Sequence, residues 1–331
     1  MSALNRSWSW IVAVILAGLG LYLAMPAHSY LGEVTGSDAQ VKWNFAPGSF
    51  AVQWSLNPGK GSNISGGRSL ADLVQSSFNT WTTAPNALVL VTRGGDSTKS
   101  AAADDGVNLI CFVCKGDFSK DAETLAVTFT TAQDAAGQSD GHGGTTAFAG
   151  ELIDADILFN PNTKYATDSS GTGQDLQTVA THEMGHFLGM DHTAVVRAIM
   201  FPFAPALETT LSYDDVAGLS QIYPKPAPDF ATGRVSGAIT HSGPGTPVFG
   251  AHVYADSTTS AMIPVGNVRK SPIGALTKPD GTYVINGLPL DSYIITAEPL
   301  DGPEDSTNLT GGFLQAFSRG AVDTGFTTRW H

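Results

Sequence analysis

Residues 182–192 read His182-Glu183-Met184-Gly185-His186-Phe187-Leu188-Gly189-Met190-Asp191-His192. On an α-helix, side chains four positions apart lie on one face, so His182 and His186 can bind the same metal ion. Glu183 lies about 100° further round the helix, beside that ion, where it can take a proton from a water molecule. Gly189 allows the left-handed turn that ends a helix, and the chain can then return with His192 as a third ligand.

This set of residue types predicts a zinc site. Three neutral imidazoles suit Zn²⁺ and leave a fourth position open for water, whose pKa falls when it is bound. A single histidine is usually an ordinary surface or core residue. Two histidines, a glutamate, a glycine and a third histidine at these fixed offsets rarely arise by chance. The segment therefore predicts hydrolysis of peptide bonds, with Glu183 as the general base.

The sequence on either side of this motif resembles a known family. The pattern H-E-x-x-H-x-x-G-x-x-H followed by a Met-turn is that of the metzincins. Thr193 and the run Ala198-Ile199-Met200-Phe201-Pro202 resemble the matrixin branch, which contains the matrix metalloproteinases. Residues 211–223 resemble the C-terminal helix of that branch. The resemblance covers about residues 40 to 224 and is most specific at 182–202.

The resemblance implies a fold and a set of roles. The fold is α+β, a metzincin catalytic domain with a twisted mixed sheet and three main helices. His182, His186 and His192 would bind one catalytic zinc and Glu183 would be the general base. Met200 would lie beneath the zinc and Pro202 would form a wall of the substrate pocket. The strand at residues 154–159 would be an edge strand that pairs with an extended substrate.

The sequence departs from the matrixin pattern at the positions whose side chains would bind a second, structural zinc ion. By the resemblance, the ligands of that zinc would stand at Lys115, Val127 and Asp156, none of which is a histidine. We therefore expect one zinc in the chain. Calcium is possible because loops carry hard oxygen donors. These donors are Asp117, Asp121, Asp134 and Asp140.

Apolar periodicity and turn residues predict the main elements of the first half of the chain. Helices are expected at residues 70–81, 175–188 and 212–223. Short strands are expected at residues 41–56, 88–91, 107–113, 125–130 and 155–159.

The second half of the chain has a different composition and a different pattern of apolar residues. A Pro-rich linker at residues 225–229 predicts a domain boundary after a catalytic domain at 30–224. Residues 230–331 contain short β-rich runs and a Gly-rich tail, without a helical period, which predicts a small all-β sandwich. The pattern at about 230–300 resembles carboxypeptidase regulatory-like modules, and it contains no set of catalytic residues.

Charge and the N-terminus indicate where the protein works. The 331-residue chain has a net charge of -13, which disfavours nucleic acid and anionic lipid as partners. The apolar run from Ile11 to Met25 is shorter than the roughly 20 residues that span a bilayer. We therefore expect residues 1–29 to be a cleaved signal peptide, without stable membrane insertion afterwards, and a secreted, periplasmic or extracellular protein.

Cys111 and Cys114 are the two cysteines of the chain. They stand where a strand runs into a loop, which favours a local disulfide or two unpaired thiols over redox catalysis.

These observations predict a secreted zinc metalloendopeptidase that acts on protein or peptide substrates. A different class stays open: a secreted binding or adhesion protein whose peptidase-like domain is an inactive scaffold.

Overall fold

The computed structural model describes residues 32–330 except 38, 46–49, 117, 119–123, 204–206, 244, 260–267, 301–313, 315–316 and 318–320. The expected signal peptide lies outside the described residues, and so do Asp117 and Asp121. Among the described residues, none of the helices is both long enough and apolar enough to cross a membrane.

The first half of the chain is built on a five-stranded mixed sheet, as predicted. The strand order is β3-β1-β4-β6-β5, and the pairings β1/β3, β1/β4 and β4/β6 are parallel whereas β5/β6 is antiparallel. The strands are β1 (Val52–Leu56), β3 (Val91–Asp96), β4 (Asn108–Cys111), β5 (Ala126–Gln133) and β6 (Glu151–Phe159). A small separate sheet contains β2 (Ile64–Ser65), β7 (Tyr165–Ala166) and β8 (Gln174–Asp175).

The expectation that residues 154–159 form an edge strand is wrong. They belong to β6, which pairs with β4 on one side and with β5 on the other. Among the described residues, the outer strands of this sheet are β3 and β5, and β5 is the one beside β6. An apolar run shows that a strand is buried but does not show which strands lie beside it. The sequence pattern therefore could not tell whether β5 or β6 lies at the edge of the sheet.

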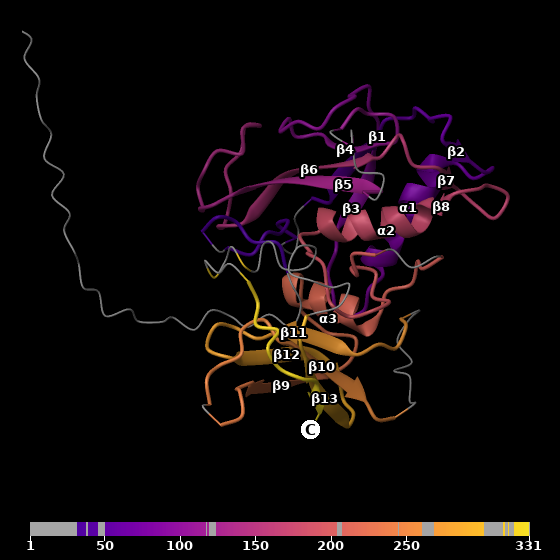
Figure 1. Ribbon diagram of the computed structural model, residues 1–331. Coiled ribbons are helices and arrows are strands. Elements are labelled where there is room, and N and C mark those ends of the chain that lie inside the picture. The colour runs from indigo at the N-terminus through magenta and orange to yellow at the C-terminus, as the bar shows by residue number, and fades with distance from the viewer. Residues whose placement is uncertain are drawn as a thin grey trace, which may run out of the picture.

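Three helices were expected, and all three are present. They are α1 (Leu70–Thr82), α2 (Leu176–Phe187) and α3 (Tyr213–Ile222). The Ser69 hydroxyl caps α1 by accepting from the backbone amide of Asp72, and the apolar side chains of α1 line one face. Figure 1 shows α1 and α2 beneath the five-stranded sheet, with α3 between them and the C-terminal strands.

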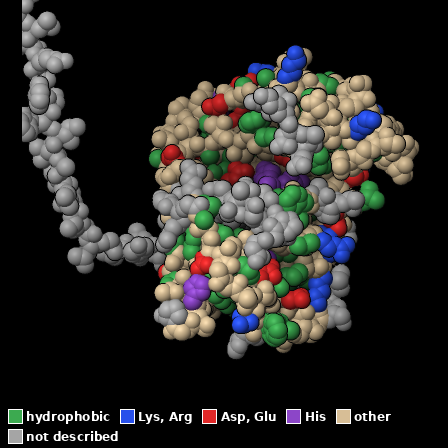
Figure 2. Space-filling view, viewed as in Figure 1, with side chains coloured by type: hydrophobic (Ala, Val, Ile, Leu, Met, Phe, Trp, Pro, Cys, Tyr) green, Lys and Arg blue, Asp and Glu red, His purple; other side chains and the backbone are tan. Residues whose placement is uncertain are grey.

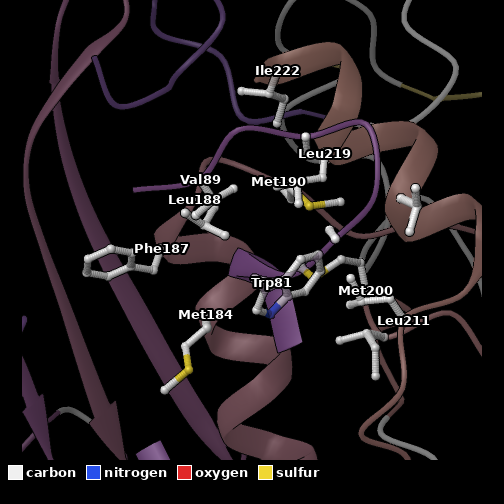
Figure 3. Close-up of a cluster of buried hydrophobic side chains, with 14 of the residues drawn as sticks. Trp81, Val89, Met184, Phe187, Leu188, Met190, Met200, Leu211, Leu219 and Ile222 are labelled. Carbon is white, nitrogen blue, oxygen red and sulfur yellow. The ribbon is translucent and has the colours of Figure 1, made fainter. Parts of the chain in front are cut away.

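The core between the sheet and the helices is rich in aromatic side chains. Trp54 stacks on Phe78, and Phe78 meets Phe187 of α2 edge to face at 5.2 Å. The Trp81 indole donates to the backbone carbonyl of Thr181 at 2.8 Å, which ties α1 to α2. Each fully buried large side chain stabilises the fold by about 1.5–3 kcal/mol. Figure 3 shows Trp81 beside Met200 in this core.

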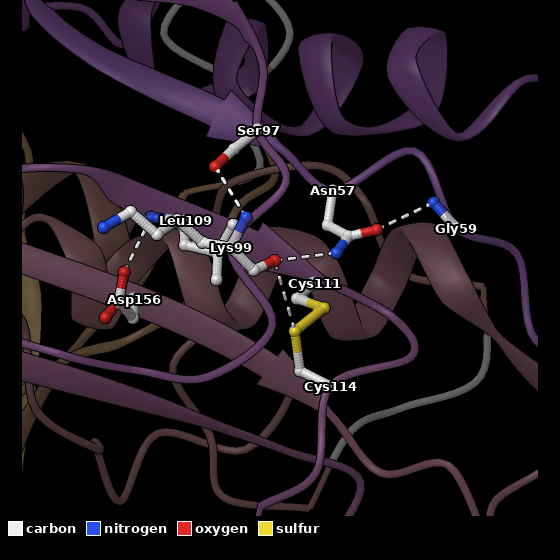
Figure 4. The surroundings of a disulfide bond; sticks show 8 residues. All are labelled: Asn57, Gly59, Ser97, Lys99, Leu109, Cys111, Cys114 and Asp156. Carbon is white, nitrogen blue, oxygen red and sulfur yellow. Dashed lines mark hydrogen bonds between the residues drawn. A yellow bond between two sulfur atoms is a disulfide. The ribbon is translucent and has the colours of Figure 1, made fainter.

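A second, smaller cluster lies on the opposite face of the sheet. Side chains of β4 alternate, so Ile110 joins the main core while Leu109 and Cys111 join the smaller cluster. Cys111 and Cys114 form a disulfide with a Cα–Cα distance of 5.6 Å, which confirms the local bridge and excludes the two unpaired thiols. Figure 4 shows this bridge beside the backbone of Lys99.

The second half of the chain forms two antiparallel sheets, as the β-rich pattern predicts. One has the order β11-β10-β13-β14 and the other pairs β12 with β9. The strands are β9 (Thr232–Ala238), β10 (His252–Ser257), β11 (Ile273–Leu276), β12 (Thr282–Pro289), β13 (Tyr293–Glu298) and β14 (Arg329–Trp330).

These sheets share their core with the first half of the chain. One continuous cluster of buried apolar side chains includes Phe187 of α2, Leu219 of α3 and Ile285 of β12. A methyl group at Gly287 would meet the Ala217 side chain at 2.8 Å, so β12 and α3 approach closely. The linker is also fixed, because Asp229 accepts from the backbone amide of Asn86.

Candidate active site

The three predicted histidines converge in space. His182 and His186 lie on α2, and His192 follows the turn that ends it. The His182 Nε2 atom lies 3.2 Å from Nε2 of His186 and 3.3 Å from Nε2 of His192. Among the described residues, these three form the group of potential metal ligands that the fold assembles. Figure 2 shows histidine side chains recessed in the middle of one face of the molecule.

The other ring nitrogens fix the tautomer of two of these rings. His182 Nδ1 lies 2.7 Å from the Ile199 carbonyl, and His186 Nδ1 lies 2.8 Å from the Met190 carbonyl. A carbonyl oxygen can only accept, so both Nδ1 atoms carry the proton and both Nε2 atoms present a lone pair. Two lone pairs 3.2 Å apart cannot bond each other, and a shared cation would satisfy both. The donor set therefore fits zinc.

Burial keeps the imidazoles of His182 and His186 neutral. It lowers the pKa of His182 to about 3, with a smaller contribution from His192. It also lowers the pKa of His186 well below its ordinary value, helped by the two neighbouring histidines. A neutral imidazole is the form that binds a metal ion.

Glu183 lies one residue after the first histidine and is 5% exposed. The Thr128 hydroxyl of β5 donates to its Oε2 at 2.6 Å. Burial raises the pKa of Glu183 to about 7, and the Thr128 hydrogen bond opposes this rise. A carboxylate near neutral pKa can both accept and return a proton, which is what a general base that later acts as an acid requires.

The turn after α2 brings His192 back to the other two histidines. Gly189 has φ +79°, its amide donates to the His186 carbonyl at 2.8 Å, and the Met190 amide donates to the Gly185 carbonyl at 3.0 Å. This pair of bonds is a Schellman motif, which favours glycine at the left-handed position. The sequence predicted this role for Gly189, and the structure confirms it.

Met200 is buried against α2. A methyl group at Gly185 of α2 would overlap the sulfur atom of Met200. Glycine at position 185 therefore lets the buried Met200 side chain pack directly against the helix. Asp215 holds the same loop by accepting from the backbone amides of Ile199 at 2.9 Å and Met200 at 3.1 Å. Asp215 also completes a capping box with Ser212.

Comparison with known proteins matches this part of the chain to one family. The family model described as Matrixin matches residues 107–224. Residues 107–224 are therefore similar to the matrixins, and this match covers little more than a third of the chain. Rabbit macrophage metalloelastase (Oryctolagus cuniculus) is 37% identical over 106 residues, covering 28% of this chain and 22% of that protein. Rat matrilysin (Rattus norvegicus) is 37% identical over 92 residues, covering 26% of this chain and 34% of that protein.

Human matrix metalloproteinase-16 (Homo sapiens) is 38% identical over 94 residues, covering 26% of this chain and 16% of that protein. The chain thus spans about a third or less of the length of these curated relatives. The matrixin family depends on zinc, and the three-histidine group is compatible with one catalytic ion. The α+β fold predicted from the sequence agrees with the matrixin match.

Sequence reasoning missed one acidic residue beside the histidines. Glu33 lies 3.7 Å from His186 Nδ1, and its Oε2 accepts from the Thr130 hydroxyl of β5 at 3.0 Å. Burial, with added repulsion from Asp191, raises the pKa of Glu33 to about 8. The pairing of Glu33 with the backbone of Gly189 brings it there, and no motif in the sequence marks that long-range contact.

Other predicted site residues are placed as follows. Pro202 is partly buried just after Phe201, and its role in a substrate pocket stays a prediction. Asp134 accepts hydrogen bonds from Ser37, and Asp140 accepts from the backbone amides of His142 and Gly144. These carboxylates have protein partners, and calcium binding likewise stays a prediction.

Two of the positions that the resemblance assigned to a structural zinc, Val127 and Asp156, make other interactions. Val127 packs against the disulfide cluster. Asp156 accepts from the backbone amides of Leu109 at 2.7 Å and Ala103 at 2.8 Å, and burial raises its pKa to about 6.

We expect purified protein to bind one zinc ion tightly, because only the histidine group offers three convergent nitrogen donors among the described residues. Metal analysis after dialysis should give about one zinc per chain. The triple variant H182A/H186A/H192A, as a control, should retain none. Two tightly bound zinc ions in the wild type would contradict this prediction.

Proposed function

We propose that this chain is a secreted zinc metalloendopeptidase that hydrolyses protein or peptide substrates. The observation that carries the proposal is the convergence of three imidazole Nε2 atoms beside the buried carboxyl group of Glu183. The matrixin match supports the same reaction class.

Bound zinc would polarise the scissile carbonyl group and make a water molecule more acidic. Glu183 would take the proton of the attacking water at a carboxylate oxygen and then return it to the nitrogen of the leaving amine. The Thr128 hydroxyl would orient Glu183 through the 2.6 Å hydrogen bond to Oε2. The carbonyl groups of Ile199 and Met190 would hold the His182 and His186 rings in place.

The sheet suggests how a substrate would lie. Thr128 of β5 contacts Glu183, and β5 is an outer strand of the described sheet. We propose that an extended peptide pairs with β5, and not with residues 154–159, and is thereby brought to the histidines. Phe129, which is 47% exposed on β5, offers an apolar contact to such a peptide.

Localisation outside the cytoplasm is part of the same proposal. The apolar N-terminal run supports export, and the Cys111–Cys114 disulfide is of a kind that persists in oxidising compartments.

The direct test is cleavage profiling of purified protein with a broad peptide library. We expect internal peptide bonds to be cleaved, activity to disappear after chelation, and activity to return on adding zinc. Zinc-loaded, folded protein that cleaves nothing in the library would favour the alternative of an inactive binding scaffold.

A further inference from the structure

A pair of buried hydrogen bonds joins the C-terminal sheet to the histidine site. The backbone amide of Gly274, on β11, donates to Asp214 Oδ1 at 2.9 Å. The Thr193 hydroxyl donates to Asp214 Oδ2 at 2.7 Å. Thr193 directly follows His192, so a single carboxyl group on α3 links β11 to the third zinc ligand.

The burial of this link makes it stiff. Asp214 is 2% exposed and Thr193 is 6% exposed, so water cannot replace either partner at low cost. Packing acts in the same place, because a methyl group at Gly274 would lie 2.9 Å from the side chain of Val195. Movement of β11 would therefore disturb the segment that carries His192.

A second contact restrains the loop on either side of Met200. The Arg269 guanidinium contacts the Glu208 carboxylate and the backbone carbonyl of Arg197. Arg197 has φ +70°, a conformation that is strained for a residue with a side chain. The Arg269 backbone also pairs with the chain where α3 begins, since its amide donates to the Leu211 carbonyl at 2.8 Å and its carbonyl accepts from the Tyr213 amide at 3.0 Å.

We infer that the segment from Arg269 to Gly274 is a positioning element of the active site, which sets the place of His192 through Asp214 and Thr193. This inference rests on the proposed zinc site. It assigns the C-terminal sheets a role in the first half of the chain, so they are not a separable accessory module.

Coupling of this kind is reciprocal. If β11 helps to hold His192 where zinc is bound, zinc at His192 must in turn stabilise the hydrogen bond from the Gly274 amide. The exchange rate of that amide with solvent reports this bond and does not depend on catalysis.

The experiment is hydrogen exchange on the full chain, first stripped of metal with a chelator and then loaded with zinc. We expect zinc to slow exchange in the peptide that contains Gly274 by about fivefold or more. Thr193→Val should remove this difference and weaken zinc binding by about 10- to 100-fold. Thr193→Ser, which keeps the hydroxyl, should restore both.

Thr167→Val is the matched control. Thr167 is 3% exposed and its hydroxyl donates to the Ser65 carbonyl at 3.2 Å, away from Asp214. This variant should keep both the zinc affinity and the zinc-dependent protection of Gly274.

Exchange at Gly274 that does not respond to zinc in the wild type would overturn the inference, and this comparison needs no variant to fold. Loss of the coupling in Thr167→Val as well would also overturn it. If zinc protects the Gly274 amide from exchange but the protein cleaves no peptide, the result would contradict the proposed peptidase function and would leave this inference standing.

Discussion

Replacing Glu183 by glutamine should lower kcat/KM for a peptide substrate by about 100- to 10,000-fold, the usual contribution of a general base. Zinc should stay bound, because the three imidazoles are untouched. The fold should also survive, since the amide oxygen of glutamine can still accept from Thr128. Burial raises the pKa of Glu183 to about 7, so loss of its charge carries little cost in folding free energy.

The measurements are peptide turnover, zinc content and urea unfolding of the same preparations. Glu298→Gln is a suitable control, because Glu298 lies in the C-terminal sheet and pairs with His252. It should leave turnover unchanged. A Glu183→Gln enzyme that keeps more than about a tenth of wild-type turnover would show that Glu183 is not the general base.

Gly189→Ala should destabilise the folded state by more than about 3 kcal/mol and weaken zinc binding at least tenfold. A residue with a side chain in the left-handed region costs about 1–2 kcal/mol. In addition, the new methyl group would overlap the backbone carbonyl of Val41, which cannot yield as a flexible side chain does. Because the turn at Gly189 brings His192 back to the site, its displacement separates the ligands.

Gly137→Ala is the matched control for backbone strain. Gly137 also has a left-handed φ of +75°, but it is exposed and a methyl group there would meet nothing within 4 Å. It should cost about 1–2 kcal/mol in urea unfolding and leave zinc affinity unchanged. Equal losses in the two variants would contradict the proposed role of the Val41 contact.

Local patterns in the sequence were enough to predict the three helices and the turn at Gly189. Each depends on residues within a few positions of one another. The three histidines were also predictable, because a helix and one turn bring them together without help from distant segments.

Contacts between distant segments were not predictable in this way. The register of β5 against β6, the approach of Glu33 to His186 and the bond from Gly274 to Asp214 join residues far apart in the chain. Tertiary packing determines these long-range contacts, and the periodicity of apolar residues along the sequence does not report them. The linker at 225–229 predicted a domain boundary, and no local pattern indicated that α3 would pack against β12 across it.

The disulfide cluster has a consequence for how the protein is made. On the face of the sheet opposite the main core, this chain has a covalent bridge between Cys111 and Cys114 within an apolar cluster. Maturation of that face therefore depends on the supply of an oxidant, while maturation of the histidine site depends on the supply of zinc. The two steps need different reagents, an oxidant and a metal ion, and neither step uses the residues of the other.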